Sequence, residues 1–244
     1  MKHYGLIGYP LTHSFSKKYF GEKFQRERII DCSYENFALA AIEDFTSLIH
    51  SEKELVGLNV TIPYKETVIP YLDVLDDTAR DIGAVNTIKI SGGKLKGFNT
   101  DVFGFMQSIM QLLEPHHNSA LILGTGGSSK AVAWSLKKMG IDYLFVSRNP
   151  ASEEEISYNA LNPDVIRQNK IIINTTPRGM FPLVDDAPEI PYESITPSHL
   201  LFDLVYNPEE TLFLKKGKEQ QAKTKNGLEM LQLQAERSWQ IWNT

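Results

Sequence analysis

The sequence predicts an α/β protein with largely parallel sheets, and three observations support this fold class. Short apolar runs alternate with amphipathic helical stretches from one end of the chain to the other. The pattern changes near Phe98, and a second α/β series starts at Ser119. The chain has 244 residues, of which 42% are hydrophobic, so it can bury a large core in either one or two domains.

The first α/β series contains apolar runs of strand length with helical material between them. The expected strands cover 4–8, 55–62 and 87–90, and the expected helical stretch covers 66–82. A further amphipathic helix over 102–113 stops before Pro115 and a polar stretch, and we place the domain junction in it.

The second series begins with a buried strand over 120–123, a helix over 130–139 that Gly140 can end, and a strand over 143–146. The closing stretch 228–242 has helical spacing with no strand after it, so we expect it to return to the first domain. The predicted domains are residues 1–101 plus 227–244, and residues 102–226.

Composition and charge favour a small-molecule partner. The formal charge of −5 has no basic block, which argues against nucleic acid or an anionic membrane as a partner. Cys32 is the one cysteine, and the six histidines lack the spacing of zinc sites, so neither a disulfide nor a metal is expected. Without a signal-peptide or membrane-span pattern, we expect a cytoplasmic protein. The sequence leaves open whether it is a monomer or a homodimer.

A glycine turn follows the strand at 120–123 and leads directly into a helix. Its residues are Gly124, Thr125, Gly126, Gly127, Ser128 and Ser129. Glycines let the backbone approach a pyrophosphate, whose charge meets the free N–H groups at the helix start. We therefore predict a Rossmann-like nucleotide-binding domain, with Gly124, Gly126, Gly127 and Ser128 against the cofactor. Ser129 replaces the usual third glycine, and a purely steric turn is the alternative interpretation.

The end of the next strand favours NADP over NAD. Ser147 and Arg148 occupy the place where an NAD site usually offers a carboxylate to the ribose. A guanidinium group suits a 2′-phosphate instead. The alternative is a solvated surface arginine, and the acidic run 153–155 would repel a phosphate if it faced one.

Three polar residues in the first series could support carbonyl reduction. Lys65 follows a strand end, where Pro63 can serve as an early helix residue, and Asp101 directly precedes the connecting helix. Asn86 lies between them and can both donate to and accept from a polyol. A lysine, a carboxylate and an amide provide a proton donor, its orienting group and a hydroxyl ligand. A surface lysine, a helix N-cap and a turn asparagine are the alternative roles.

With these residues in place, the chain resembles the shikimate dehydrogenase family over nearly its whole length. Seven separated motifs occur in the family's order: 8–16, 57–65, 83–87, 99–101, 174–180, 203–211 and 227–235. The resemblance implies NADPH-dependent, reversible reduction of 3-dehydroshikimate to shikimate, in the biosynthesis of chorismate and the aromatic amino acids. A quinate or dual quinate/shikimate dehydrogenase is the nearest alternative. A non-catalytic protein that senses a nucleotide or ligand is a remote one.

The resemblance also implies roles for particular residues. Lys65 and Asp101 match the catalytic pair. The implied substrate ligands are Ser14, Ser16, Thr61, Asn86, Tyr206 and Gln234, with the two serines on the carboxylate. Thr175, Gly227 and Met230 match motifs at the cofactor. By helical periodicity alone, Met230 would be core and Gln234 surface.

Three departures from the family are visible. Lys17-Lys18-Tyr19-Phe20 replaces a proline and a His-Asn pair, and either lysine could add charge toward the carboxylate. Ser147-Arg148-Asn149 replaces Asn-Arg-Thr. The segment between Arg148 and Asn174 is short, which predicts an outer strand that is reduced or lost.

Overall fold

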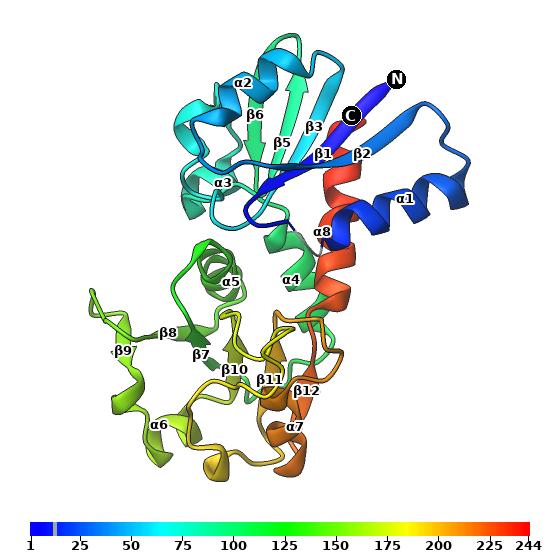
Figure 1. Ribbon diagram of the computed structural model, residues 1–244. Helices are drawn as coiled ribbons and strands as arrows, with labels where there is room; N and C mark the ends of the chain where they lie inside the picture. Colours follow the sequence, from blue (N-terminus) through cyan, green and yellow to red (C-terminus); the bar gives the residue numbers. More distant parts are fainter. Residues whose placement is uncertain (12–13) are drawn as a thin grey trace. The chain divides into compact units, whose positions relative to one another are not determined.

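The computed structural model describes residues 1–11 and 14–244, and it divides into two compact units (Figure 1). The first unit contains Met1–Thr100 and Gln234–Thr244, and the second contains Asp101–Leu233. Each unit has its own six-stranded sheet. Thr12 and His13 of the opening motif lie outside the described residues.

The first unit has a mixed sheet with the strand order β2-β1-β3-β5-β6-β4. Its strands are β1 (Lys2–Gly8), β2 (Cys32–Ala38), β3 (Leu55–Val60), β4 (Val74–Leu75), β5 (Thr87–Ser91) and β6 (Lys94–Phe98). β1 is parallel to β2 and β3, whereas β5 is antiparallel to both β3 and β6. The carboxyl ends of β1, β3 and β6 and the start of β5 therefore share one edge of the sheet.

The helical stretch expected over 66–82 is wrong for most of its length. It consists of turns, a short 3-10 helix η1 (Ile69–Tyr71), the two residues of β4, and a short helix α3 (Asp77–Ile82). Pro70 disfavours a continuous helix, and the Asp76 side chain accepts a hydrogen bond from the Ala79 amide at 2.9 Å, which starts α3 afresh. Five further elements were not expected from the sequence pattern: β2, β4, β6, α1 (Phe15–Glu27) and α2 (Asp44–Ser51).

The last helix, α8 (Leu228–Trp242), belongs to both units. Met230 lies in a core cluster of the second unit, whereas Ala235 and Trp242 lie in an aromatic cluster of the first. The boundary falls between Leu233 and Gln234, while the sequence placed the return of the chain at residue 227. The helix ends where the Trp242 indole donates to the Ile88 carbonyl at 2.9 Å.

The second unit has an all-parallel sheet with the order β12-β11-β10-β7-β8-β9. Its strands are β7 (Ser119–Leu123), β8 (Asp142–Ser147), β9 (Glu155–Ser157), β10 (Ile171–Asn174), β11 (Leu200–Asp203) and β12 (Lys223–Lys225). Numbered within the unit, this is the order 3-2-1-4-5-6 of dinucleotide-binding sheets. The outer strand β9 is reduced to three residues, as predicted, and no helix separates it from β8.

Residues of the central strand alternate between two cores, as a sheet covered on both faces requires. Ala120 and Ile122 of β7 pack in one cluster, and Leu121 and Leu123 pack in the other. The helices of the unit are α4 (Asp101–Met110), α5 (Gly127–Lys138), α6 (Pro163–Gln168) and α7 (Leu212–Glu219). The crevice of such a sheet lies at the carboxyl ends of β7 and β10, where the strand order reverses.

Candidate functional site

The first unit brings most of the predicted substrate residues to one edge of its sheet. Thr61 follows β3, and its amide donates to the carbonyl of Ile7 in β1 at 2.9 Å. The amide of Val60 donates to the carbonyl of Asn86 at 2.8 Å, because β5 starts where the antiparallel β3 ends. The carbonyl of Lys65 accepts from the amide of Val85 at 2.7 Å. Thr61, Lys65 and Asn86 are therefore neighbours, although Asn86 comes 25 positions after Thr61 in the chain.

Residues around Pro63 correct one expectation. The segment after Thr61 forms turns, in which the amide of Tyr64 donates to the Thr61 carbonyl at 2.9 Å, and Pro63 does not begin a helix. The buried Tyr64 ring anchors this segment, and its hydroxyl donates to the Leu39 carbonyl at 2.6 Å. Lys65 is half-buried beside it. A lysine held on a turn at a sheet edge can present its ammonium group to a ligand.

Ser14 and Ser16 lie at the start of α1, a helix of 13 residues. Ser14 is the N-cap, and its Oγ accepts from the Lys17 amide at 3.3 Å. The capping bond uses the oxygen and leaves the hydroxyl hydrogen to donate, so capping and ligand binding are compatible. Because the positive end of a helix dipole favours an anion, this place suits a carboxylate.

The two lysines after Ser16 are engaged elsewhere. The ammonium group of Lys17 lies 2.6 Å from a carboxylate oxygen of Glu35, and that of Lys18 lies 3.8 Å from Glu22. Tyr19 contacts α8 instead, where its hydroxyl donates to Glu236 at 2.5 Å. Lys17 and Tyr19 thus tie α1 to β2 and α8, whereas the pair of Lys18 and Glu22 lies within α1.

The amide groups of Asn86 and Gln234 meet in the buried interior at this edge. The Thr100 backbone amide donates to Asn86 Oδ1 at 2.7 Å. Because a backbone N–H can only donate, the oxygen atom of the Asn86 side-chain amide, and not its nitrogen, faces Thr100. Asn86 Nδ2 then donates to Gln234 Oε1 at 3.3 Å. Gln234 is 8% exposed, so the surface position that periodicity alone suggested is wrong.

Further polar residues, for which the sequence predicted no role, surround these two amides. Tyr34 donates to Asn59 Oδ1 at 2.8 Å, and Asn59 Nδ2 donates to the Asn86 carbonyl at 3.3 Å and to Ser238 Oγ at 3.0 Å. Burial raises the pKa of Tyr34, and a hydrogen bond from Ser16 lowers it in part. One signal was available: Ser238 lies four residues after Gln234, on the same face of a helix.

Asp101 is the first residue of α4 and is 6% exposed. It follows Thr100 directly, whose amide and hydroxyl both contact Asn86 Oδ1. The chain therefore leaves the polar cluster of the first unit and enters the second unit with a buried carboxylate at the helix start. Asn99, just before it, is held by a bond from its Nδ2 to the Ala84 carbonyl at 2.9 Å.

The glycine turn of the second unit has the features of an anion site. Gly124 has φ +107°, a conformation that favours glycine, and an added Cβ would lie 2.9 Å from Thr175 Oγ1. Gly126 is exposed, with no atom within 4 Å of an added Cβ, and it is an N-cap without a side-chain hydrogen bond. The 12-residue α5 therefore begins, at Gly127 and Ser128, directly after this open position.

Ser129, which stands at the third glycine position, faces inward. It is 1% exposed, and its hydroxyl donates to the Gly126 carbonyl at 2.5 Å. A small buried residue permits the same close packing of helix on strand for which the family uses glycine. The substitution is therefore compatible with a nucleotide at the turn.

Arg148 is exposed just beyond the end of β8. Ser147 ends the strand and accepts from the Asn149 amide at 3.2 Å. Of the acidic run after it, Glu155 belongs to β9 and accepts from the Ala151 amide at 3.0 Å, so that carboxylate is used to close the loop. Glu153 and Glu154 are exposed.

Two loops follow β10 and β11 at the crevice of the sheet, and Asp203 joins them. Its Oδ1 accepts from Asn174 Nδ2 at 2.9 Å and from the Val205 amide at 3.0 Å, and its Oδ2 accepts from the Thr211 hydroxyl at 2.6 Å. Asp203 is fully buried, and burial raises its pKa to about 6 against the lowering effect of these three bonds. Thr175 lies in the first loop and donates to the Leu123 carbonyl at 2.7 Å.

The remaining predicted residues of the second unit lie in different surroundings. Tyr206 is half-buried in the loop after β11, and burial raises its pKa. Gly227 is required by the fold, because an added Cβ would lie 2.2 Å from the Leu204 carbonyl oxygen. Met230 is 6% exposed within the apolar core cluster, the position that helical periodicity gives it.

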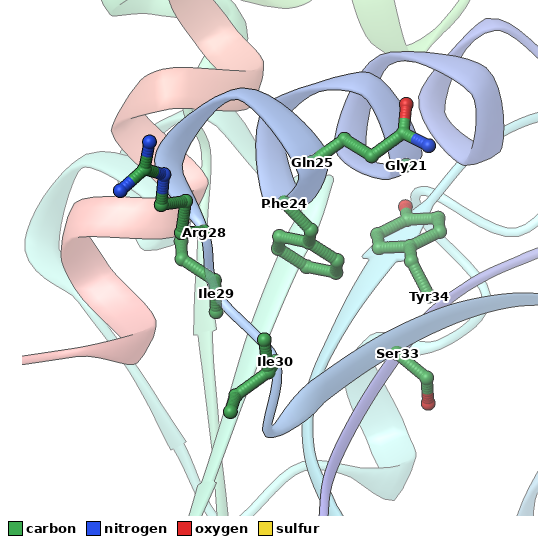
Figure 2. A pocket seen from close by; sticks show the side chains of 8 residues that line it. All are labelled: Gly21, Phe24, Gln25, Arg28, Ile29, Ile30, Ser33 and Tyr34. Carbon is green, nitrogen blue, oxygen red and sulfur yellow. The ribbon is translucent and has the colours of Figure 1, made fainter.

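An apolar groove of about 600 Å³ lies elsewhere on the first unit, between α1 and the start of β2 (Figure 2). Phe24, Ile29 and Ile30 are among the residues that line it, and none of the predicted site residues does. Within the described ranges 1–11 and 14–244, no helix is long and apolar enough to cross a bilayer. The same ranges hold no group of three or more potential metal ligands.

Two features together define the class of protein. One unit has a parallel sheet of order 3-2-1-4-5-6 with a glycine turn, and the other has buried amide side chains and a lysine at the edge of its sheet. This is the architecture of a nicotinamide-dependent dehydrogenase with separate nucleotide and substrate units.

Comparison with known proteins makes the assignment specific. Residues 6–88 match the model of the shikimate dehydrogenase substrate binding domain. A shikimate dehydrogenase (NADP+) of Clostridium beijerinckii is 42% identical over 252 residues, which cover 99% of this chain and 92% of that protein. One of Desulforamulus reducens is 36% identical over 98% of this chain and 88% of its own length.

A solved structure agrees in fold. The shikimate 5-dehydrogenase of Thermus thermophilus, in complex with NADP(H) and shikimate, has a TM-score of 0.87 and 29% identity, covering 99% of this chain and 93% of that one. The chain belongs to the shikimate dehydrogenase family.

Proposed function

We propose that this protein is an NADP-dependent shikimate dehydrogenase that interconverts 3-dehydroshikimate and shikimate. Full-length similarity to enzymes of that name supports the reaction and the cofactor. The observation that carries the proposal is the shared sheet edge of the first unit, where Thr61, Lys65 and Asn86 meet. Fold alone would not suffice, because one fold can carry many functions.

The substrate would be held by its carboxylate and its hydroxyls. The hydroxyls of Ser14 and Ser16 at the start of α1 hold the carboxylate, where the helix dipole adds attraction. Thr61, Asn86 and Gln234 bind ring hydroxyls, and Tyr206 adds a contact from the loop after β11. Such a set of fixed donors orients the ring and reduces the entropy cost of reaching the reactive geometry.

Lys65 and Asp101 would manage the proton at the reacting oxygen. Bound NADPH supplies the hydride that reduces the ketone carbon. The oxygen of that ketone gains a proton as its charge develops, and Lys65 donates it, while the Asp101 carboxylate orients the ammonium group. In the reverse direction Lys65 accepts the proton of the shikimate hydroxyl.

The residues of the second unit fit the cofactor. The open space beside Gly126 and the uncapped start of α5 suit the pyrophosphate, with Gly124, Gly127 and Ser128 forming the turn. Arg148 would bind the 2′-phosphate, with Ser147 beside it. Thr175, Gly227 and Met230 would lie toward the nicotinamide end. The first unit, Met1–Thr100 with Gln234–Thr244, then forms the substrate domain, and the second unit, Asp101–Leu233, forms the nucleotide domain, of an enzyme that we expect in the cytoplasm.

The proposal is tested by measuring the initial rate at which NADP+ or NAD+ is reduced, with either shikimate or quinate as the substrate. Turnover of shikimate with NADP+ is the expected result. Preference for quinate would favour the alternative substrate, and preference for NAD+ would remove the role of Arg148. A folded protein without turnover in any pairing would favour a ligand-sensing protein and refute the proposal.

Lys65→Met sharpens the test, because it keeps the apolar stem and removes the proton donor. We expect kcat to fall about 10²- to 10⁴-fold, the usual contribution of general acid–base catalysis, with binding of NADP+ unchanged. Lys18→Met, at an exposed position on α1, is the matched control and should retain full activity.

A further inference from the structure

A cluster of three buried hydroxyl groups lies behind the amides of Asn86 and Gln234. Thr87 and Ser238 are fully buried and Thr100 is 1% exposed, so none of the three is placed to touch a ligand. Thr87 Oγ1 lies 2.7 Å from Ser238 Oγ and 3.2 Å from Thr100 Oγ1, and the latter two atoms are 3.2 Å apart. These three residues, which we name the hydroxyl cluster, come from β5, the connection between β6 and α4, and α8.

The hydroxyl cluster contacts both amides on their oxygen side. Thr87 Oγ1 and Thr100 Oγ1 each lie 3.1 Å from Asn86 Oδ1, where they add to the bond from the Thr100 amide. Thr100 Oγ1 lies 3.2 Å from Gln234 Oε1, and Ser238 Oγ lies 2.9 Å from the Gln234 backbone carbonyl. A hydroxyl group can donate to an amide oxygen or accept from an amide nitrogen, so it does not select the orientation of an amide by itself. The Thr100 backbone amide can only donate, so it sets the orientation of Asn86, and the hydroxyls then support that arrangement.

The contacts fix which end of each amide faces inward. Asn86 turns its oxygen to the Thr100 amide, so its nitrogen faces Gln234. Gln234 accepts this bond with its Oε1, which the Thr100 hydroxyl also contacts. The Nε2 end of the Gln234 amide therefore points away from Asn86 and Thr100. Rotating either amide by half a turn would place two donors against each other in a buried site, which is costly.

We propose that the hydroxyl cluster of Thr87, Thr100 and Ser238 acts together with the Thr100 backbone amide as a positioning device, which holds Gln234 with its Nε2 amide hydrogens toward an oxygen atom of the substrate. The inference rests on the proposed function and deepens it, because it assigns a donor role to one ligand of the same site. A substrate oxygen that accepts there is favoured, whether a ring hydroxyl or a ketone. The three residues act through Gln234 and Asn86, not by contact with the substrate.

Two substitutions of Thr87 separate hydrogen bonding from packing. Thr87→Val keeps the shape and removes the hydroxyl, whereas Thr87→Ser keeps the hydroxyl and removes a methyl group. In the valine variant, Asn59 Nδ2 still donates to the Asn86 carbonyl, and the Ser238 hydroxyl still donates to the Gln234 carbonyl. Both neighbours of residue 87 therefore keep a hydrogen-bond partner. Both variants should fold.

For Thr87→Val we expect the KM for shikimate to rise about tenfold, the effect of weakening about one hydrogen bond, with the KM for NADP+ unchanged. Thr87→Ser should stay within about twofold of the wild type, because the hydroxyl is restored. A merely structural role predicts the opposite order, since burial of the methyl group would then matter more.

Wild-type turnover of shikimate is measured first, and its absence refutes the proposed function without bearing on the variants. If the wild type is active, an unchanged KM in Thr87→Val overturns the positioning role, as does an equal loss in Thr87→Ser. Circular dichroism verifies folding. If Thr87→Val does not fold, Ser238→Ala replaces it, with the same expected rise in the KM for shikimate and the same refuting result.

Discussion

We predict that the stability of the second unit depends on pH through the buried carboxyl group of Asp203. Asp203 is fully buried, and its three hydrogen-bond donors are two uncharged side chains and one backbone amide. Burial raises its pKa from 3.8 to about 6, since removal of water disfavours the ionised form more than the three bonds favour it. A difference of about 2 in pKa, at about 1.4 kcal/mol each, corresponds to roughly 3 kcal/mol.

The sign follows from proton binding. A carboxyl with a higher pKa in the folded state binds its proton more tightly there, so its contribution to stability is complete below pH 3.8 and is lost as the pH rises through about 6. About 2 kcal/mol of this contribution develops between roughly pH 7.5 and pH 4.5.

Asp203→Asn removes the titration and keeps the shape. The amide oxygen can still accept from Asn174 and Val205, and the Thr211 hydroxyl can accept from the new amide nitrogen. The free energy of unfolding of the wild type, relative to the variant, should therefore increase by about 2 kcal/mol from roughly pH 7.5 to pH 4.5.

Urea unfolding followed by tryptophan fluorescence measures this difference, with Trp134 on α5 reporting the second unit. Asp185→Asn, the same substitution at an exposed position of the second unit, is the matched control. A wild-type-minus-Asp203→Asn difference that stays constant, or that falls toward acid, would refute the reasoning.

Two glycine substitutions distinguish a cofactor position from a structural one. Gly126→Ala adds a Cβ that has no atom within 4 Å beyond its own stretch of chain, so thermal unfolding should be unchanged. The KM for NADP+ should rise about tenfold or more, because the methyl group occupies the approach to the pyrophosphate. An unchanged KM would show that the cofactor does not pass there. Gly227→Ala places its Cβ 2.2 Å from the Leu204 carbonyl, so the variant should lose about 2 kcal/mol or more of stability, which a thermal melt measures. A melt equal to that of the wild type would mean that the close approach is easily relieved.

The sequence was most informative where local pattern and local structure coincide. The strand, glycine turn and helix around Gly126 need only neighbouring residues, and β7 and α5 form there as predicted. The count of residues between Arg148 and Asn174 was enough to predict a reduced outer strand. Motif order along the chain was enough to identify the family, because motifs are properties of the sequence itself.

The sequence was least informative where a short polar segment is stabilised by distant neighbours. β6 forms because it pairs with β5, and the stretch expected as one helix over 66–82 is divided by Pro70 and by the pairing of β4 with β6. Cross-strand pairing competes with helical periodicity, and no window of adjacent residues reveals which of the two is more stable.

What the sequence by itself determined was the fold class, the family and the residue types available for chemistry. Only the tertiary structure decided how those residues are used. Gln234 is on the interior side of α8, the oxygen of Asn86 is taken by the Thr100 amide, and Ser238 is buried behind both. The physical reason is that a hydrogen-bond donor selects an acceptor through space. Asn86 and Gln234 are 148 positions apart in the chain. The antiparallel pairing of β5 with β3 and the return of the chain in α8 bring Asn86 Nδ2 within 3.3 Å of Gln234 Oε1.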